Sequence, residues 1–226
     1  MKKWEELPEE LQLKEVREYY DALQLHRGGL LAKSIFDIIV SGVLLVLASP
    51  ILLVLSILIK LDSPGSVMFR QVRVTTYGKE FRIFKFRTMV NHADKMGSQV
   101  TTRGDARVTR MGKLLRGCRL DELPQLLNIL KGEMTFVGTR PEVPKYVQHY
   151  TNEMKATLLL PAGVTSRASI EYKDEERLLE NAENADEVYV QQVLPEKMRY
   201  NLEAMKNFSF FEDIKTMFAT VAAVIK

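Results

Sequence analysis

A long uncharged segment constrains this chain more than any other feature. The 22 residues from Ile38 to Ile59 carry no charged side chain and are mostly apolar. A helix of roughly 20 apolar residues is long enough to cross the hydrocarbon core of a bilayer once. The default interpretation is therefore a transmembrane helix, and the rest of the chain must fold beside it.

A re-entrant helix is the alternative interpretation of this segment. Ser49-Pro50 lies at its midpoint, where proline removes a helical hydrogen bond and clashes with the preceding turn, so we expect a kink or a break there. Two half-helices of about 11 residues each reach roughly the bilayer midplane, provided that Ser49 or neighbouring protein satisfies the freed backbone groups. The positive-inside rule does not predict which end of the segment faces the cytoplasm, because cations flank both ends. These cations are Arg27, Lys33, Lys60, Arg70 and Arg73. Physical reasoning leaves the two interpretations equally open.

The composition limits what the rest of the chain can be. With 226 residues, 46% of them hydrophobic, the chain can bury one sizeable core, or one core together with an anchoring segment. The net charge of +3 is modest, so we expect no nucleic-acid partner. The single cysteine, Cys118, excludes an internal disulfide and suits a reducing compartment.

Amphipathic helices are expected at both ends of the chain. Residues 1–30 are too densely charged for a signal peptide, and their apolar residues recur at helical spacing from Leu7 to Leu23, with Gly28-Gly29 as a stop. This helix could lie on the membrane, on a partner subunit or against the core. Near the C-terminus, Phe208 to Ile225 form an apolar helical face, which could lie in the bilayer interface or pack against the core.

A short β element follows the apolar segment. Val67–Val74 and Phe81–Met89 are β-prone runs joined by Tyr77-Gly78-Lys79, which predicts a hairpin. In the second run Lys85 and Arg87 alternate with aromatic residues and share one face, which is either a solubilising surface or a phosphate-binding one. Two polar runs are interpreted as a loop, Asn91–Asp105, and as a solvated helix, Glu171–Asn184.

Two adjacent carboxylates stand before an apolar helical stripe in the run R-L-D-E-L-P-Q-L-L-N-I-L, residues 119–130. The stripe has the i, i+3, i+4, i+7 spacing of one buried face and consists of Leu123, Leu126, Leu127 and Leu130. Asp121 and Glu122 then lie at a helix N-terminus, which favours ionised carboxylates, and Lys131-Gly132 closes the helix with a left-handed glycine. An ionised Asp can attack phosphorus or hold a divalent cation, whereas an acidic N-cap is the plainer interpretation.

Cations surround this carboxylate pair in the sequence. They are Arg107, Arg110, Lys113, Arg116 and Arg119 before the pair, and Arg140 after it. A magnesium-bound diphosphate would explain why both signs of charge gather together, because Mg²⁺ takes one or two carboxylates plus phosphate oxygens. Arginines would neutralise the remaining phosphate oxygens through bidentate contacts. A salt-bridged surface is the plainer alternative.

The motifs in this order resemble those of the bacterial sugar transferases, the monotopic polyprenol-phosphate phosphoglycosyl transferases. The matching runs are K-S-I-F-D-I before the interrupted apolar stretch, F-K-F-R-T-M (84–89), R-V-T-R-M-G-K-L-L-R (107–116), L-D-E-L-P-Q-L-L-N-I-L-K-G-E-M (120–134) and F-V-G-T-R-P-E (136–142). The resemblance covers about Lys33 to the C-terminus. It implies that the Ser49-Pro50 segment is a re-entrant helix and that the catalytic domain faces the cytoplasm at the bacterial inner membrane.

The resemblance also implies an activity. The family transfers a sugar 1-phosphate from a UDP-sugar to undecaprenyl phosphate, the first membrane step in making capsule, exopolysaccharide, O-antigen or glycoprotein glycans. By this likeness Asp121 is the nucleophile on the β-phosphorus, releasing UMP and leaving a covalent phosphosugar, and Glu122 is the principal Mg²⁺ ligand. Candidate phosphate ligands are Lys85, Arg87, Arg116, Arg119 and Arg140. The alternatives are a non-catalytic, membrane-anchored nucleotide-sugar-binding protein and a metal-dependent UDP-sugar hydrolase.

The chain departs from the family pattern at three places. Thr139 stands where most relatives have proline, and Pro161–Ser169 replaces a P-G-I-T-G-W-A-Q run, so a preference for one sugar or base cannot be carried over. An acidic residue that precedes the final helices in some relatives aligns with Asn201, which we leave out of the catalytic set.

The sequence thus predicts a mostly helical α+β protein in three parts. These are an N-terminal amphipathic helix in residues 1–30, a re-entrant membrane helix in 31–62 that is broken at Ser49-Pro50, and a catalytic domain in 63–226 with a β-hairpin and a C-terminal interfacial helix. The expected partners are Mg²⁺, a UDP-sugar, undecaprenyl phosphate and the lipid bilayer. The identity of the sugar, the polysaccharide pathway and a homodimer are left open.

Overall fold

The computed structural model describes residues 1–93, 96, 105–172 and 184–225. It is mostly helical with two two-stranded sheets, as the α+β prediction requires. The helices are α1 (Lys14–Leu25), α2 (Arg27–Asp62), α3 (Arg110–Gly117), α4 (Leu126–Leu130), α5 (Pro144–Val147), α6 (Arg167–Glu171), α8 (Ala185–Val188), α9 (Leu194–Lys206) and α10 (Phe210–Ile225). The strands are β1 (Met68–Val74), β2 (Glu80–Phe86), β3 (Met134–Val137) and β4 (Ala162–Thr165). The shorter turns are η1 (Trp4–Glu6), η2 (Glu9–Leu11), η3 (Thr76–Gly78), η5 (Leu120–Gln125), η6 (Met154–Leu159) and the π-helical η7 (Tyr189–Val193). Most of the predicted loop Asn91–Asp105 and of the predicted helix Glu171–Asn184 lies outside the described residues.

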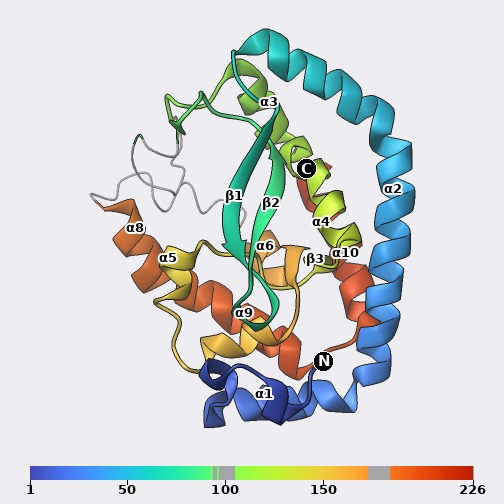
Figure 1. Cartoon of the computed structure of the whole chain (residues 1–226), viewed down its shortest axis with the longest axis vertical. Coiled ribbons are helices and arrows are strands. Elements are labelled where there is room, and N and C mark those ends of the chain that lie inside the picture. Colours follow the sequence, from blue (N-terminus) through green and yellow to red (C-terminus); the bar gives the residue numbers. More distant parts are fainter. Residues whose placement is uncertain (94–95, 97–104, 173–183, 226) are drawn as a thin grey trace.

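The apolar segment forms the middle of α2, a single 36-residue helix that curves along one side of the molecule (Figure 1). The predicted separation into two half-helices at Ser49-Pro50 is wrong, because the helix continues through Pro50. Proline has no N–H to donate to the carbonyl oxygen of Val46, four residues earlier. The Ser49 hydroxyl replaces that donor at 2.7 Å from the Val46 oxygen, as the sequence had allowed. The helix therefore curves without leaving this carbonyl group unpaired.

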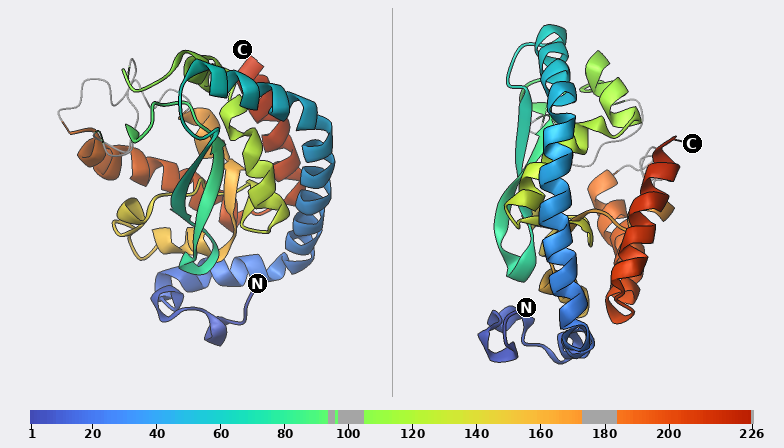
Figure 2. Two further views of the ribbon diagram at one scale, coloured as in Figure 1. Left: turned by 45° about the horizontal axis from the view of Figure 1, so that its top comes forward. Right: turned by 90° about the vertical axis from the view of Figure 1, so that its right-hand side faces the viewer.

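The first half of α2 is attached to the folded body by buried polar contacts. Lys33 Nζ lies 2.7 Å from a carboxylate oxygen of Asp213 on α10, which runs beside this part of α2 (Figure 2). One turn later, Asp37 is 4.0 Å from the same lysine and accepts a hydrogen bond from Thr135 on β3. Because all four side chains are largely buried, these contacts determine which face of α2 is turned inward.

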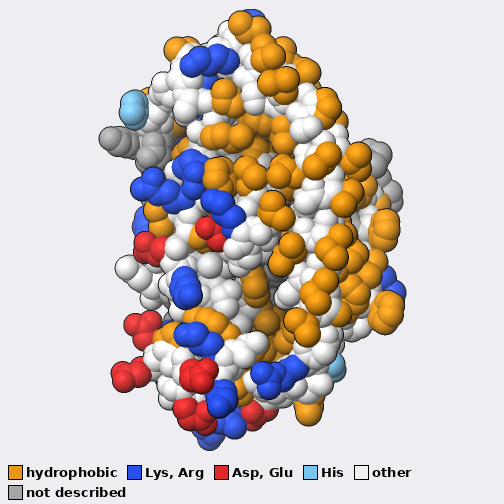
Figure 3. Space-filling view, turned by 45° about the vertical axis from the view of Figure 1, so that its right-hand side comes forward, with side chains coloured by type: hydrophobic (Ala, Val, Ile, Leu, Met, Phe, Trp, Pro, Cys, Tyr) orange, Lys and Arg blue, Asp and Glu red, His pale blue; other side chains and the backbone are white. Residues whose placement is uncertain are grey.

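The opposite face of α2 is apolar and exposed. The exposed residues spread along both halves of the helix and include Leu31, Ile35, Ile39, Val43, Val46, Leu47, Ile51, Leu53, Val54, Ile57 and Leu61. Figure 3 shows hydrophobic side chains covering this side of the molecule. Phe211, Phe218 and Val221 of α10 are also exposed, whereas Met217 of α10 and Phe208, which precedes this helix, pack against the core. The predicted packing against the core is thus confirmed for these two residues. By length and composition α2 is the one described helix that could cross a membrane.

The N-terminal segment packs against the core. The predicted helix is shorter than expected, because η1 and η2 precede α1 and Gly28-Gly29 lie inside α2 rather than at a stop. Val16, Tyr19 and Leu23 of α1 are buried among residues of η6 and α9. The packing role that the sequence left open is thus confirmed for these residues.

The strands form two separate sheets. β1 and β2 pair antiparallel around the η3 turn, and β2 ends at Phe86, three residues earlier than predicted. The second sheet, in which β3 pairs parallel with β4, was not predicted. The backbones of the β3 and β4 segments approach so closely that a Cβ atom at Gly163 would lie 2.2 Å from the backbone nitrogen of Gly138. A side chain is therefore excluded where β4 runs beside the end of β3.

Arg87 caps the C-terminal end of α2 from the residue just after β2. Its guanidinium donates to the carbonyl oxygens of Ser63 and Pro64 at 2.7 and 2.8 Å and to the Ser63 hydroxyl at 3.0 Å. Nearby, the backbone N–H of Met111 donates to Asp62 at 3.1 Å. We predicted from the sequence that Arg87 binds phosphate. In the structure its N–H groups instead bind Ser63 and Pro64 and hold the end of α2 against the β1–β2 sheet.

This placement predicts a stability effect for Arg87→Lys. An ammonium group cannot reach the same set of oxygens, so we expect the free energy of unfolding to fall by roughly 2 kcal/mol. Arg82→Lys, an exposed change on β2, is the matched control and should cost less than about 0.5 kcal/mol. Denaturant unfolding in detergent micelles measures both, and equal stabilities of the two variants would contradict the capping role.

Candidate active site

Asp121 and Glu122 lie in the first turn of η5, a 3₁₀ helix that continues into α4. Arg119 precedes them in the left-handed region, at φ 52°, and this turn of the chain starts the helical segment. The predicted end of the helix is confirmed, since Gly132 has φ 72°. Its N–H and that of Glu133 bond to the carbonyl oxygens of Ile129 and Asn128, a glycine-closed helix end.

The buried face of this segment differs from the predicted one. Leu126 and Ile129 are buried, but Leu130 is 43% exposed. Because η5 has about three residues per turn, the α-helical spacing counted from Leu123 does not hold across it. Asn128 is fully buried instead, where its side chain bonds to the backbone of Arg82 and Phe84 on β2.

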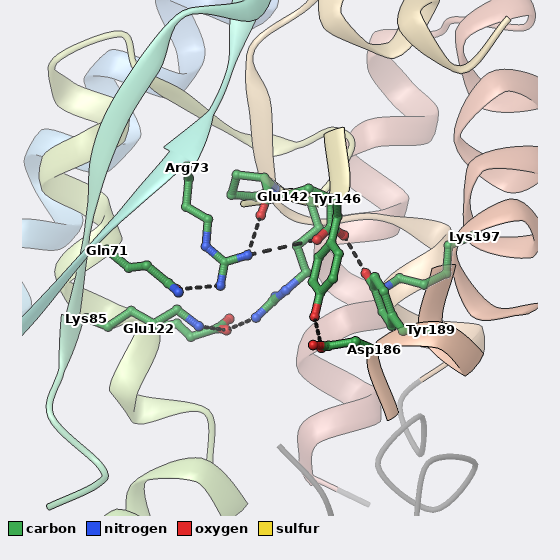
Figure 4. A network of polar contacts seen from close by, with 11 residues as sticks. Gln71, Arg73, Lys85, Glu122, Glu142, Tyr146, Asp186, Tyr189 and Lys197 are labelled. Carbon is green, nitrogen blue, oxygen red and sulfur yellow. Dashed lines mark hydrogen bonds and ion pairs between the residues drawn. The ribbon is translucent and has the colours of Figure 1, made fainter. Parts of the chain in front are cut away.

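Glu122 is bound by two cations from different parts of the fold. Lys85 Nζ of β2 lies 2.9 Å from Glu122 Oε1 (Figure 4). Arg140, which follows β3, donates to the same oxygen. Lys85 points inward because it shares a strand face with buried Phe81 and Ile83. Burial opposes ionisation of Glu122, but Arg140 and Lys85 overcome it and hold the pKa of this carboxyl well below its usual range. Glu122 is therefore a fixed negative charge.

Asp121 is in a different electrostatic environment. Its side chain is 8% exposed, and among the described residues no hydrogen bond to its carboxylate is recorded. Burial raises the pKa of Asp121, the charge of Lys85 opposes this, and the charge of Glu122 adds to it. Burial likewise lowers the pKa of Lys85, although Glu122 opposes that shift. The site thus holds one firmly ionised carboxylate beside one whose ionisation is less favourable.

The other predicted cations are distributed unevenly around this site. Arg116 on α3 is half-buried, and its charge favours the ionised form of Asp121. Arg119 contributes its backbone, since the Glu122 N–H donates to its carbonyl oxygen at 3.3 Å. No contact of the Arg119 side chain with either carboxylate is recorded in the described part of the chain. Lys85 and Arg140 are therefore the predicted cations that the fold brings directly onto Glu122.

Arg140 is presented by the β3–β4 pairing. The N–H of Gly138 donates to Thr165 O at 2.9 Å, and the N–H of Gly163 donates to Thr139 O at 2.8 Å. Thr139 takes part through its carbonyl oxygen, which proline would also supply, so this departure from the family motif leaves the turn intact. Residues 162–165, part of the other departure, form the strand that holds the turn.

A polar network that the sequence did not reveal extends from the site (Figure 4). Arg73 of β1 lies 3.9 Å from Glu142, donates to Pro141 O at 3.0 Å and donates to Gln71 at 2.8 Å. Tyr189 of η7 donates to Glu142 at 2.5 Å. Two features of the sequence could have indicated this network. Gln71 and Arg73 are two residues apart on a strand and so share one face, and Glu142 is the last residue of the F-V-G-T-R-P-E motif.

The two carboxylates could hold a divalent cation with help from a phosphate. Among the described residues there is no group of three or more His, Cys, Asp or Glu side chains placed for a metal ion. Mg²⁺, however, needs only one or two carboxylates when phosphate oxygens and water complete its coordination. The Asp121 carboxylate and Glu122 Oε2, for which no described partner is recorded, fit that requirement.

A cavity of about 770 Å³ lies among the start of α2, α9, α10 and the end of β3. Lys33, Asp37, Thr139 and Asn201 contribute to its lining, whereas Asp121 and Glu122 do not. Asn201, which we left out of the catalytic set, is thus one of the residues at this cavity.

Fold and site together define a class: a protein with a membrane-length apolar helix and a buried carboxylate pair set among basic side chains, a combination suited to phosphate esters. A family model described as bacterial sugar transferase matches residues 29–226. The chain belongs to the bacterial sugar transferase family.

Several curated proteins are similar to this chain. It is 35% identical over 84% of its length to UDP-N-acetylgalactosamine-undecaprenyl-phosphate N-acetylgalactosaminephosphotransferase of Aeromonas hydrophila, of which it spans 42%. It is 33% identical over 86% of its length to UDP-glucose:undecaprenyl-phosphate glucose-1-phosphate transferase of Caulobacter vibrioides, of which it spans 70%. The uncharacterized sugar transferase EpsL of Bacillus subtilis is 33% identical over 87% of the chain, which spans 88% of that protein.

The opposite environments of the two carboxylates predict opposite effects on stability. Asp121→Asn should raise the free energy of unfolding at neutral pH, because it removes a buried charge whose pKa is raised by burial. The gain should shrink as the pH falls through the folded-state pKa of Asp121, since the wild-type carboxyl then becomes neutral as well.

Glu122→Gln should lower the free energy of unfolding by about 3 kcal/mol, because it leaves the partly buried cations Lys85 and Arg140 without their counter-charge. Denaturant unfolding of the three proteins between pH 5 and pH 8 measures both effects. Stabilities that change in the same direction in both variants would contradict this account of the site.

Proposed function

We propose that this protein transfers a sugar 1-phosphate from a UDP-sugar to undecaprenyl phosphate, with Asp121 as the nucleophile and UMP as the first product. Membership of the family and the substrates named for the Aeromonas and Caulobacter relatives support the reaction. The observation that carries the proposal is the pair itself: Asp121 is buried without a recorded hydrogen bond, beside a Glu122 carboxylate that Lys85 and Arg140 hold.

The first step forms a covalent phosphosugar on Asp121. A carboxylate oxygen attacks the β-phosphorus, the bond from that phosphorus to the bridging oxygen breaks, and UMP leaves with the electron pair. Asp121 attacks in its ionised form. Among the described residues its carboxylate accepts no recorded hydrogen bond, so none has to break before the attack. Its raised pKa keeps its electrons more available than those of an ordinary Asp.

The second step returns the enzyme to its starting state. A phosphate oxygen of undecaprenyl phosphate attacks the same phosphorus, the bond between phosphorus and Asp121 breaks, and the carboxylate is regenerated as the lipid diphosphate sugar leaves. Dividing the transfer in this way lets a soluble and a lipid substrate use one site in turn. Lys85, Arg116 and Arg140 surround the pair with positive charge, which stabilises charge on the transferring phosphoryl group.

Glu122 and Asp121 are the residues that would hold Mg²⁺. When bound, Mg²⁺ would neutralise phosphate charge and help UMP to leave. Lys85 and Arg140 keep Glu122 ionised and in one orientation, so the ligand is prepared before the ion arrives.

The transfer reaction is tested by measuring UMP release from a panel of UDP-sugars, with undecaprenyl phosphate present or omitted. We expect sustained release only with the lipid and Mg²⁺, loss on chelation, and a decrease of at least about a thousandfold in Asp121→Asn. Asp21→Asn, an exposed change in a surface ion pair, is the control and should retain full activity.

A phosphosugar adduct on Asp121, found by mass spectrometry when the lipid is omitted, would support the covalent route. Equal release with and without the lipid would indicate a hydrolase. Binding of a UDP-sugar without any turnover would favour the binding protein, and an active Asp121→Asn variant would exclude Asp121 as the nucleophile.

We further propose that α2 enters the membrane from the cytoplasmic face and returns to it without crossing. The two ends of α2 contact the same polar domain, through Asp213 and Thr135 near its start and through Arg87 and Met111 at its end. A crossing helix would have to place one of these contacts on the far side of the bilayer. Unpaired charged groups there would cost several kcal/mol each, which favours a re-entrant arrangement with the curved middle of α2 inserted.

Cysteine labelling tests this topology. In a background without the exposed Cys118, single cysteines replace Leu31, Leu61 and Val46, which are 63%, 79% and 72% exposed on α2. A membrane-impermeant maleimide should label the first two positions from the cytoplasmic side only and should label Val46 poorly from either side. Labelling of Leu31 and Leu61 from opposite sides would overturn the proposal.

A further inference from the structure

The segment that carries Arg140 is held by a second ion pair, separate from the one at Glu122. Arg140, Pro141 and Glu142 are consecutive, and the Glu142 side chain is buried. Arg73 contacts this segment twice, through Pro141 O at 3.0 Å and through the Glu142 carboxylate at 3.9 Å. Tyr189 donates its hydroxyl to Glu142 Oε1 at 2.5 Å (Figure 4). The two residues that follow Arg140 are therefore both held in place, Pro141 by Arg73 and Glu142 by Arg73 and Tyr189.

The backbone of this segment is fixed as well. The N–H of Val74 on β1 donates to Glu142 O at 2.9 Å, and the N–H of Gly138 donates to Thr165 O at 2.9 Å. Both ends of the short stretch 138–142 are thus attached to strands. The position of Arg140 relative to Glu122 then depends on whether Glu142 stays in its place.

The charges explain why Arg73 needs a carboxylate of its own. Arg73, Lys85 and Arg140 are close enough for their charges to influence one another. Burial lowers the pKa of Arg73, Glu142 opposes this shift, and the charge of Arg140 adds to it. The recorded ion pairs keep the two carboxylates apart: Arg73 pairs with Glu142, whereas Lys85 and Arg140 pair with Glu122. Glu142 therefore pairs with Arg73 and leaves Glu122 to Lys85 and Arg140.

We propose that Glu142, held by Tyr189 and Arg73, is a positioning residue that keeps Arg140 on Glu122 for the transfer reaction. The role rests on the proposed function, and Glu142 acts through Arg140 without touching the reacting atoms. Tyr189 begins η7, so the C-terminal helical part of the chain contributes to the placement of Arg140.

Tyr189→Phe tests this role with the smallest possible change. The variant removes the hydroxyl that binds Glu142 and keeps the ring packed against Tyr146, whose centroid is 4.9 Å away. We expect kcat for UMP release to fall about tenfold, as expected for a small displacement of a group that neutralises phosphate. Tyr146→Phe is the matched control: its hydroxyl binds Asp186 at 2.5 Å instead of Glu142, and kcat should stay within about twofold of wild type.

A double-mutant cycle separates positioning from a general loss of structure. In an Arg140→Ala background, Tyr189→Phe should reduce kcat by less than about twofold, because the group that it positions is already gone. An undiminished tenfold loss in that background would overturn the proposal. So would equal losses in Tyr189→Phe and Tyr146→Phe.

The same four proteins of the cycle are compared by denaturant unfolding in detergent micelles, which needs no activity. The effect of Tyr189→Phe on the unfolding equilibrium should be at least halved in the Arg140→Ala background, and fully additive effects would contradict the link between Glu142 and Arg140. If wild-type protein shows no lipid-dependent UMP release, the proposed function fails, while this second cycle still decides whether Glu142 positions Arg140.

Discussion

The ionised carboxylate of Glu122 is the constraint on which the rest of the site depends. A buried charge is tolerated only when it is paired and hydrogen-bonded, and Glu122 obtains both partners from distant segments, Lys85 on β2 and Arg140 after β3. The two sheets must therefore be fixed relative to η5. Asn128 joins α4, which continues η5, to the backbone of β2, and the close approach of Gly138 and Gly163 holds together the sheet that presents Arg140.

The same buried polar chemistry joins the site to the anchoring helix. α2 turns Lys33, Asp37 and Ser41 inward and keeps a long apolar face outward, so its polar residues bind the body while its outer face suits lipid. Ser49 compensates for Pro50 locally, which allows curvature without an unpaired carbonyl group. The proposed lipid substrate would carry its phosphate at the headgroup level, and the proposed insertion of α2 would keep the carboxylate pair near that level.

Much of the site could be predicted because its residues are clustered in short motifs. The run around Asp121 and Glu122, with Lys85 and Arg140 in neighbouring motifs, pointed to the groups that the fold brings together. Arg87 was assigned wrongly because strand alternation holds only while the strand lasts: β2 ends at Phe86, and Arg87 turns to the end of α2. The exposure of Leu130 was missed because a 3₁₀ turn changes the helical period.

The helical class, the membrane-length apolar segment and the carboxylate pair could be predicted from the sequence, because each depends on residues that are neighbours in the chain. Three features became visible in the fold alone: α2 continues through Pro50, β3 pairs with β4, and Glu142 contacts both Arg73 and Tyr189 next to Arg140. The last two features depend on contacts between residues far apart in the chain, for example 47 positions for Tyr189 and Glu142 and 68 positions for Arg73 and Pro141. The spacing of residues in the sequence does not predict such contacts, because they form between distant segments only after folding buries their polar groups.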